Sequence, residues 1–426
     1  MTEEVSGSRV DRDELHRRAA STSPELIIGL VGAIGTDLSA VAAALSTALM
    51  EEASYTARTI RLSSMLHELE GLEPLDPRPD KLHYYQERMR AGTELRQKLE
   101  RADAMAWLAL LDIRQARDEM LTASPLVERR AFLLHSLKRK EEIDSLRNIY
   151  GPAFFLVAAY APRDKRVDRL ARAIAESRGH WRSLDLRSEA EQLVRTDEKE
   201  LDEPLGQDVQ GAFPEADVFI DATNLEEMSR SVRRFIRLIF GHKFHTPTRG
   251  ECGMFFAKAA AVRSAALGRQ VGAAITTGSG ELLAVGTNEV PKAGGGLYWD
   301  EDEPDGRDFK LGEDRSDRHK QDLIAELLRS LRDAGWLAEK YGTLDLQELR
   351  TQVLKKDGGE VGPWRASRIM NLIEFMRPVH AEMAALMEAA RRGVSIQKGV
   401  LYVTTFPCHE CARWALLPGA TWSSSS

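Results

Sequence analysis

Two short stretches near the end of the chain hold residue types that bind metal ions. His380 and Glu382 begin an Ala-, Leu- and Met-rich stretch, and the sequence PCHEC at 407–411 follows a short apolar run. Zinc in proteins takes neutral imidazole and thiolate ligands, and a catalytic site combines three protein ligands with a water molecule. His380, Cys408 and Cys411 would supply those three ligands. A bound ion would lower the pKa of the water towards 7, which favours hydrolytic chemistry.

Glu382 is too near His380 along the chain to be a convenient fourth ligand, but it is well placed to carry protons between water and a substrate. Plainer interpretations stay open. A glutamate at a helix start commonly does no more than complement the helix dipole, and a C-x-x-C pair also occurs in redox and structural zinc sites. A structural site would need Cys252 or His409 as a fourth ligand. Cys252 lies in an apolar helical stretch, and His409 lies between the two cysteines.

Several elements must position these residues. Residues 233–270 predict helical structure, and residues 271–291 predict a hairpin of two apolar runs around the turn TGSGE. The stretch 294–377 is a charged insertion, acidic and turn-rich at first and helical over 322–342; it is either a cover over a substrate pocket or a surface elaboration. A helix from His380 and a strand over 398–406 then lead to the cysteines.

The N-terminal half has the order of a phosphate-binding loop, in which a short apolar strand runs through glycines into a helix. Counted from Gly32 against G-x-x-x-x-G-K-[ST], Asp37 takes the second glycine position, Leu38 the lysine position and Ser39 the Ser/Thr position. We therefore expect a degenerate loop, used either for regulatory nucleotide binding or as a structural turn. The candidate nucleotide-binding residues are Gly29, Gly32, Gly35 and Ser39.

The same stretch, residues 26–50, is long enough to span a membrane, but Asp37 and three glycines predict a strand, a turn and a helix instead. Further short apolar runs at 152–164 and 215–224 alternate with helical stretches and predict a parallel α/β sheet. After the first of them, Arg163, Arg166, Arg169 and Arg172 share a helix face, which is either a phosphate-facing lid or a solvated basic surface.

Composition narrows the class of ligand. The chain has 426 residues, 43% hydrophobic and 29% charged, with a formal net charge of -7. Proteins that bind a nucleic-acid backbone usually carry a positive surface, which a negative net charge does not supply. The composition therefore favours a small-molecule substrate. The chain has three cysteines, which do not form a disulfide framework. The closely spaced pair Cys408 and Cys411 suggests a reducing compartment. The first residues mix both charge signs, unlike a secretory signal. We expect a cytoplasmic protein with no membrane partner.

The pattern H-x-E followed by P-C-x-x-C is the signature of the zinc deaminases. From about Arg233 to Arg413 the chain resembles the cytidine and deoxycytidylate deaminases, and its N-terminal segments resemble P-loop nucleotide and nucleoside kinases in order and type. The fused layout is similar to bacterial anti-phage dCTP deaminases, which are thought to deplete deoxycytidine nucleotides during infection. The stretches that carry this resemblance are 133–160, 246–275, 380–386 and 404–411.

The resemblance implies Zn2+ as cofactor and roles for further residues. Asn288 matches the asparagine that holds the sugar, although an ordinary turn asparagine is the alternative. Ala381 would offer backbone groups to the pyrimidine edge, and Arg269 is a candidate partner for a phosphate. The N-terminal domain would take a second nucleotide. Related deaminases often pair subunits, so a homo-oligomer stays open.

We expect an α/β protein of two domains: a P-loop-like parallel α/β domain over 25–228 and a cytidine-deaminase-like α/β/α domain over 229–413 with an incomplete sheet. Residues 1–24 and 414–426 would be tails. After Arg413 the resemblance ends, because Pro418 breaks the helix and the four terminal serines cannot pack. We therefore expect three strands in the second sheet, and a truncation or shifted frame near Trp414 that weakens zinc binding and activity.

Three functions remain in view. The first is zinc-dependent deamination of a free deoxycytidine nucleotide, dCTP or dCMP. The second is a nucleic-acid-editing deaminase, which predicts a basic groove with aromatic platforms; 7% aromatic residues and a negative net charge supply little of either. The third is an inactive nucleotide-binding or regulatory protein.

Overall fold

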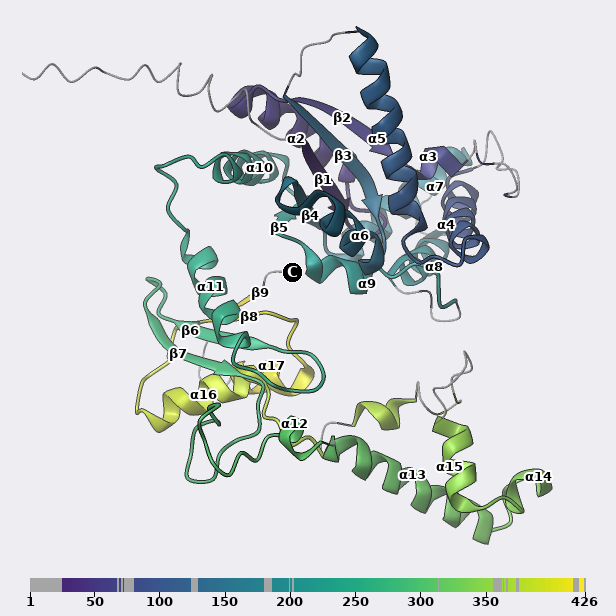
Figure 1. Cartoon of the computed structure of the whole chain (residues 1–426), viewed down its shortest axis with the longest axis vertical. Coiled ribbons are helices and arrows are strands. Elements are labelled where there is room, and N and C mark those ends of the chain that lie inside the picture. Colours follow the sequence, from purple (N-terminus) through teal and green to yellow (C-terminus); the bar gives the residue numbers. More distant parts are fainter. Residues whose placement is uncertain are drawn as a thin grey trace, which may run out of the picture. The chain divides into compact units, whose positions relative to one another are not determined.

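The computed structural model describes residues 25–66, 69, 72, 80–123, 129–179, 186–198, 200, 203–312, 314–354, 362, 364, 367–372, 375–416 and 421–424. The chain divides into two compact units, Met1–His245 and Thr246–Ser426 (Figure 1). None of the helices in the described ranges combines the length and the apolar character that crossing a membrane requires.

The first unit is built on a five-stranded sheet in the order β2-β3-β1-β4-β5, and all neighbouring strands are parallel. Every residue of the central strand β1 is buried, as an apolar run between two helical layers requires. The predicted parallel sheet is therefore confirmed. Its strands are β1 (Leu26–Val31), β2 (Thr56–Arg61), β3 (Arg130–Leu137), β4 (Phe154–Tyr160) and β5 (Val218–Asp221).

Helices cover both faces of this sheet because successive strand side chains point to opposite sides. Ile28 and Leu30 of β1 pack with α2 (Leu38–Ala53) and α10 (Leu225–Ile239). On the other face, Ile27 packs in the cluster that holds the buried side chains of α5 and α6. The remaining elements of the unit are α3 (Leu62–Met65), α4 (Lys81–Lys98), α5 (Ala104–Ala123), α6 (Lys140–Tyr150), η2 (Gly151–Ala153), α7 (Arg163–Ser177), α8 (Arg187–Glu198), α9 (Val209–Ala212) and η4 (Phe213–Glu215).

The strand, turn and helix predicted over residues 26–50 are β1, a loop and α2. The division between units falls after His245, later than the boundary expected at 228. Helix α10 explains this difference, because its apolar stripe, including Val232 and Phe235, is buried in the first unit's core. The helix expected over 233–270 is therefore two helices, α10 and α11 (Arg249–Ala261), with residues 240–248 between them.

The second unit holds a four-stranded sheet in the order β7-β6-β8-β9. Its strands are β6 (Gly272–Thr276), β7 (Leu282–Thr287), β8 (Val400–Val403) and β9 (Thr421–Ser424). Strands β6 and β7 form the predicted antiparallel hairpin. The expectation of three strands is wrong, because Thr421–Ser424 pairs in parallel with β8. A strand ladder is made by backbone groups, so even a serine-rich segment can join it.

Two Ala-rich helices lie against this sheet. Helix α11 packs through Ala257 against Ala274 and Tyr402. Helix α16 (Ala381–Arg391) packs through Ala381 and Ala385 in a second buried cluster, which includes Ile275 and Leu401 of the sheet. Strand β7 approaches α16 closely, since a Cβ at Gly286 would lie 2.3 Å from the carbonyl oxygen of Ala381. A glycine here therefore allows the first turn of α16 to rest directly on the strand. Helix α17 (His409–Leu416) also contacts α16.

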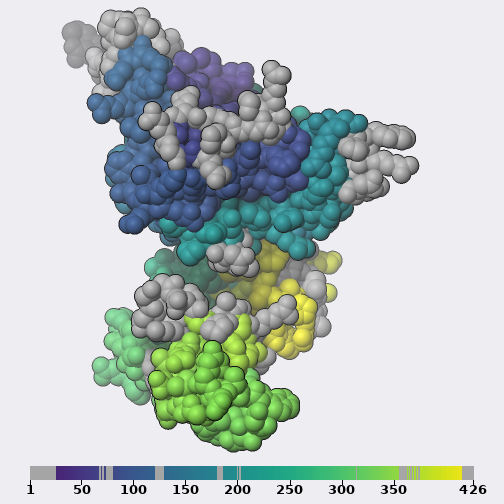
Figure 2. All heavy atoms as spheres, turned by 90° about the vertical axis from the view of Figure 1, so that its right-hand side faces the viewer, coloured from purple at the N-terminus to yellow at the C-terminus, as the bar shows by residue number. Residues whose placement is uncertain are grey.

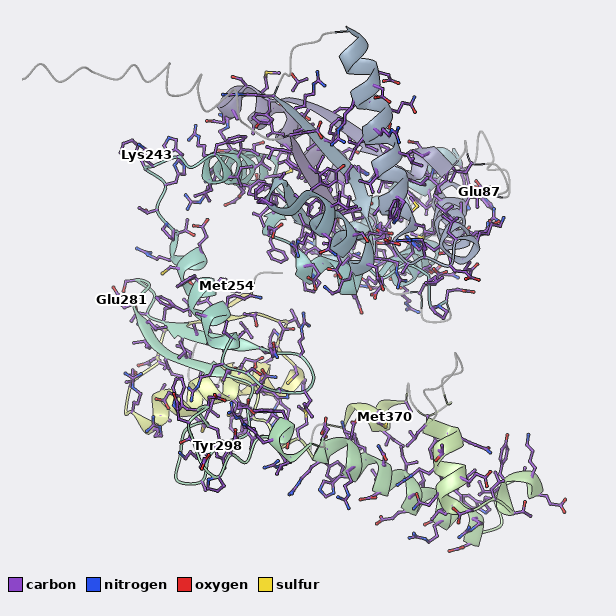
Figure 3. All side chains as sticks on the ribbon, in the orientation of Figure 1. Glu87, Lys243, Met254, Glu281, Tyr298 and Met370 are labelled. Atoms are coloured by element: carbon purple, nitrogen blue, oxygen red, sulfur yellow. The ribbon has the colours of Figure 1, made fainter. Side chains whose placement is uncertain are left out.

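The insertion contains α12 (Asp308–Leu311), α13 (Arg315–Asp333), α14 (Glu339–Gly342), α15 (Leu346–Leu354) and η5 (Arg368–Asn371). The single helix expected over 322–342 is wrong, because α13 ends before Gly335, whose φ of 70° is left-handed. Ile324, Leu328 and Leu349 join α13 to α15, and Met370 packs against them (Figure 3). In the space-filling view the green insertion helices stand out as a lobe (Figure 2).

Candidate metal centre and substrate cavity

The three predicted metal ligands converge in the second unit. His380 is the N-cap of α16, Cys408 directly precedes α17, and Cys411 lies in the first turn of α17. The Nδ1 atom of His380 lies 3.3 Å from the Sγ of Cys411 and 3.4 Å from the Sγ of Cys408. One ligand atom from each of the three residues lies within 4.8 Å of the others.

These separations fit a zinc ion. Tetrahedral bonds of about 2.3 Å to sulfur and about 2.0 Å to nitrogen place a nitrogen and a sulfur ligand roughly 3.6 Å apart. The His380–Cys distances are within a few tenths of an ångström of that value. The donor set of one imidazole and two thiols also matches a catalytic zinc site with one open position. We conclude that His380, Cys408 and Cys411 form a site for zinc.

The Cys411 thiol lies in a buried setting next to a carboxylate. Burial raises the pKa of the Cys411 thiol, and the neighbouring Glu382 carboxylate and Cys408 raise it further. The side chain is nearly inaccessible, with 2% of the residue exposed. A thiolate beside a carboxylate is unfavourable in such a place unless a cation is held between them.

Glu382 lies in the first turn of α16, two residues after the imidazole ligand, and is 3% exposed. It lines a cavity of about 300 Å³ together with His380 and Cys408. This volume is at the lower end of the range for small-molecule sites. The predicted substrate contacts Asn288, Ala381 and Arg269 line the same cavity. The structure thus brings all seven residues predicted for the metal and substrate site to one place.

Asn288 and Arg269 hold the cavity wall together. The Asn288 side chain accepts a hydrogen bond from the Val271 N–H at 2.6 Å and donates one to the Arg269 carbonyl at 2.7 Å. Arg269 in turn donates from Nη1 to Thr405 Oγ1 at 2.9 Å, in the segment between β8 and Cys408. Both side chains therefore stabilise the cavity wall by hydrogen bonds between segments that are distant in sequence.

A buried glutamate that we did not predict supports the segment before His380. Glu289 is 1% exposed, and its carboxylate accepts hydrogen bonds from the Ala265 N–H at 2.7 Å and its neighbour Val290 at 2.8 Å. Its carbonyl accepts from the Val379 N–H at 3.0 Å, next to the imidazole ligand. A lone acidic residue after an apolar strand was the available signal in the sequence. The insertion also contributes to the wall, through α13.

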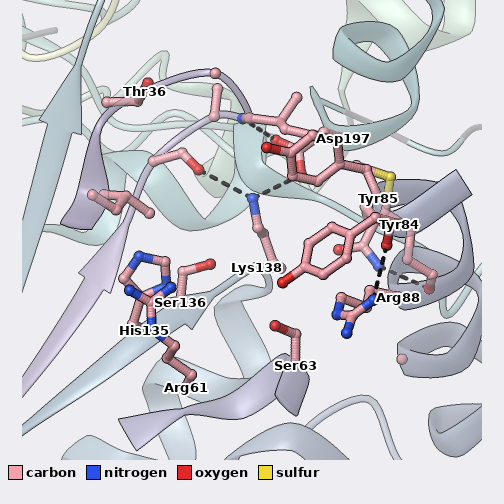
Figure 4. Close-up of a pocket in the computed structure, with 18 of the residues that line it drawn as sticks. Thr36, Arg61, Ser63, Tyr84, Tyr85, Arg88, His135, Ser136, Lys138 and Asp197 are labelled. Atoms are coloured by element: carbon pink, nitrogen blue, oxygen red, sulfur yellow. Dashed lines mark hydrogen bonds and ion pairs between the residues drawn. The ribbon is translucent and has the colours of Figure 1, made fainter. Parts of the chain in front are cut away.

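The first unit contains a separate cavity of about 410 Å³ at the loop after β1 (Figure 4). Gly32, Gly35 and Ser39 line it, with Gly35 in the left-handed region at φ 87°. The structure places Gly29 elsewhere, inside β1, where a Cβ would lie 2.7 Å from Leu137 Cδ1. That glycine allows close packing in the core and does not face the cavity.

A carboxylate of the protein occupies part of the loop's anion-binding face. Asp197 accepts the Ile34 N–H at 2.6 Å and the ammonium of Lys138 at 2.7 Å (Figure 4). Lys138 also donates to the Gly32 carbonyl at 3.1 Å. A lysine thus lies beside the loop although position 38 is leucine, but its ammonium is already paired. Neither Lys138 nor Asp197 was predicted, since both are distant from the loop in sequence.

Asp37 and the basic face of α7 meet at the same loop. Burial alone would raise the pKa of Asp37, but hydrogen bonds from Arg169 and from the Ala40 N–H outweigh it and lower this pKa. Arg166 is buried and donates to Glu198 at 2.8 Å, whereas Arg163 and Arg172 are exposed. The four arginines therefore do not act together as one lid or one solvated surface.

Comparisons with known proteins agree with the second unit's geometry. Residues 250–419 match the family model "Cytidine and deoxycytidylate deaminase zinc-binding region". This match supports a zinc-dependent deaminase domain in that part of the chain. No curated protein sequence matches the chain. Among solved structures, a gluconokinase from Sinorhizobium meliloti 1021 is similar at 16% identity, covering 53% of this chain and 98% of that one, with a TM-score of 0.27.

Proposed function

We propose that the protein hydrolytically deaminates a free deoxycytidine nucleotide, dCMP or dCTP, to the deoxyuridine nucleotide and ammonia. The observation that carries this proposal is the meeting of His380, Cys408 and Cys411 in one cluster, next to the cavity that His380, Cys408 and Glu382 line. The family match of residues 250–419 supports the same class of reaction.

The reaction replaces the exocyclic amino group of cytosine by oxygen. Water forms a bond to C4, the bond from C4 to the amino nitrogen breaks, and the two protons released by water leave one on the ring nitrogen and one on ammonia. Bound zinc supplies the Lewis acidity that makes water nucleophilic near neutral pH. Glu382 accepts one proton from water and delivers it to the ring nitrogen, and then carries the second proton to the leaving amine. Its position in the cavity, next to Cys411, suits this task.

A free nucleotide is favoured over a polynucleotide by the size of the cavity and by the charge of the chain. A cavity of about 300 Å³ suits one small ligand, and a net charge of -7 opposes binding along a phosphate backbone. From the resemblance to anti-phage dCTP deaminases, the proposal extends to depletion of deoxycytidine nucleotides in the cytoplasm during phage infection. The cavity of the first unit would then hold a second, regulatory nucleotide, in a chain that pairs with a second copy.

Purified full-length protein with zinc should convert dCMP or dCTP to the uracil form, with ammonia released in equal amount. Cytidine and single-stranded DNA should be converted more slowly. Turnover of DNA alone would instead favour the editing function, and nucleotide binding without any turnover would favour a regulatory protein. A Glu382→Ala variant that kept full turnover would remove the proton-transfer role from Glu382.

A further inference from the structure

The insertion places a buried lysine at the wall of the zinc cavity. Lys320, on the second turn of α13, is 8% exposed and lines the cavity together with His380 and Glu382. Its ion pair with Asp317 is long, at 3.9 Å, and the Asp317 side chain is 40% exposed. A lysine is almost never this buried without a close partner, because removing its charge from water costs several kcal/mol.

Ser316 lies one helical turn before Lys320 and therefore on the same side of α13. It lines the same cavity, and the residue is 5% exposed. Its Oγ has no hydrogen-bond partner among the residues that the structure describes. A buried hydroxyl without a partner costs about 1–3 kcal/mol, so a ligand that accepts its hydrogen bond would recover that energy.

The neighbouring charges leave room for an anion at this wall. Asp308, also at the cavity, is already paired with Arg377. Asp314 is exposed, and its carboxylate caps α13 by accepting the N–H groups of Ser316 at 2.9 Å and Asp317 at 3.2 Å. Arg269 adds a second cation to the cavity lining. Helix α13 thus offers one ammonium that has a long ion pair, to Asp317, and one buried hydroxyl without a hydrogen-bond partner among the described residues. An ammonium and a hydroxyl are a typical pair for a phosphate.

We propose that Lys320 and Ser316 bind the phosphate of the nucleotide whose base is deaminated at the zinc site. This inference rests on the proposed function and deepens it: the insertion makes the enzyme specific for nucleotides over nucleosides. Lys320 supplies the charge and Ser316 one directed hydrogen bond, from a single rigid helix of 19 residues.

The test compares catalytic efficiency on deoxycytidine, dCMP and dCTP. Lys320→Met should lower kcat/KM for the phosphorylated substrates by roughly 10- to 100-fold, chiefly through KM, because a hydrogen-bonded charge contact to phosphate is lost. Efficiency on deoxycytidine should change by less than about 3-fold, since no phosphate is there to bind. Lys320→Arg should keep most of the preference for nucleotides, and Ser316→Ala should lose about 2- to 10-fold of it.

Lys340→Met is the matched control, because this lysine lies on α14 of the same insertion, with its ammonium 4.5 Å from the ring of Tyr341. It should alter no substrate's kinetics. Zinc content and unfolding midpoint are measured for each variant, so that a misfolded protein is recognised. If Lys320→Met misfolds, the smaller loss expected for Ser316→Ala tests the proposal in its place. If wild-type protein converts none of the three substrates, the proposed function fails and the inference with it. If it converts them but shows no nucleotide preference, or if a folded Lys320→Met or, failing that, a folded Ser316→Ala keeps that preference in full, the inference alone is overturned.

Discussion

The two cavities of this protein differ in how their charged groups are paired. In the first unit, Lys138 is paired with Asp197 at 2.7 Å and the buried Arg96 with Glu142 at 3.0 Å. In the second, one imidazole and two thiols converge next to the Glu382 carboxylate. Lys320 at the same cavity faces its acidic neighbour only across 3.9 Å.

This difference separates a self-sufficient site from one that needs a ligand. Charges that already have partners are stabilised inside the folded chain, and a charged ligand must displace a partner in order to bind. Converging ligands without a cation gain their stabilisation when the cation arrives. We therefore expect changes in the second cavity to affect metal binding and turnover, and changes in the first to affect mainly stability.

The largest effect should come from removing a zinc ligand. Cys411→Ser should abolish both stable zinc binding and deamination, because the remaining two protein ligands do not make a catalytic zinc site. The measurement is metal content after dialysis, together with turnover of dCMP and dCTP. Cys252→Ser in α11 is the matched control and should keep both. Equal zinc content in the Cys411 and Cys252 variants would contradict the assignment of ligands.

Glu382→Gln should separate metal binding from proton transfer. The amide is nearly isosteric with the carboxylate but cannot accept the proton from water, so kcat should fall about 10²- to 10⁴-fold while zinc content stays at the wild-type level. Glu388→Gln, on the same helix and paired with Arg391 at 2.8 Å, should change neither quantity. If both variants lose turnover alike, the loss reflects damage to α16 and not the chemistry of Glu382.

Much of the second cavity could be predicted from sequence because its ligands lie at helix starts with short, fixed spacing. His380 and Glu382 are two residues apart, and Cys408 and Cys411 three apart, so each half needs only local structure. Lys320 could not be predicted in this way, because its place at the wall depends on how the insertion folds back. The first unit's Lys138 and Asp197 are 59 residues apart and meet only through tertiary structure.

The fold was predictable where apolar runs are long and bounded, as for β1 and the hairpin of β6 and β7. It was not predictable where backbone hydrogen bonding alone determines that a segment becomes a strand. The segment Thr421–Ser424 has no apolar pattern that marks a strand, yet it lies beside β8. Helix α10 was assigned to the wrong side of the domain boundary, because composition does not reveal which core an amphipathic stripe will join.

Asp197→Ala should test whether the first cavity is self-sufficient. It leaves the ammonium of Lys138 without its carboxylate and the Ile34 N–H without its acceptor, so the first unit should lose about 3–5 kcal/mol of unfolding free energy. Denaturant unfolding measures this loss. Lys140→Met removes solvent-accessible ion pairs with Asp144 and Glu215 and should cost about 0–1 kcal/mol. An Asp197→Ala protein as stable as wild type would mean that the buried pair contributes little.

The smallest effect should be a pH dependence from His135 at the first cavity. Burial, Arg61 and Lys138 lower the pKa of His135 to about 4, from 6.5 for a free imidazole, while Asp37 acts in the opposite direction. Above pH 6.5 neither the folded nor the unfolded state holds the proton. As the pH falls from 6.5 towards 4, the unfolded state takes up the proton first, so stability decreases through this window and His135 adds no further loss below it.

Replacing the imidazole should therefore flatten part of the acid sensitivity of the first unit. Between pH 7.5 and 5, His135→Gln should lose on the order of 2 kcal/mol less unfolding free energy than wild type, because each unit of pKa difference is worth about 1.4 kcal/mol. His319→Gln, on an exposed side of α13, serves as the control and should leave the slope unchanged. Since His135 lies far in sequence from His380, zinc content should stay constant over the same variants. If the unfolding free energy of His135→Gln changed with pH as steeply as that of wild type, this imidazole would titrate alike in the folded and unfolded chain.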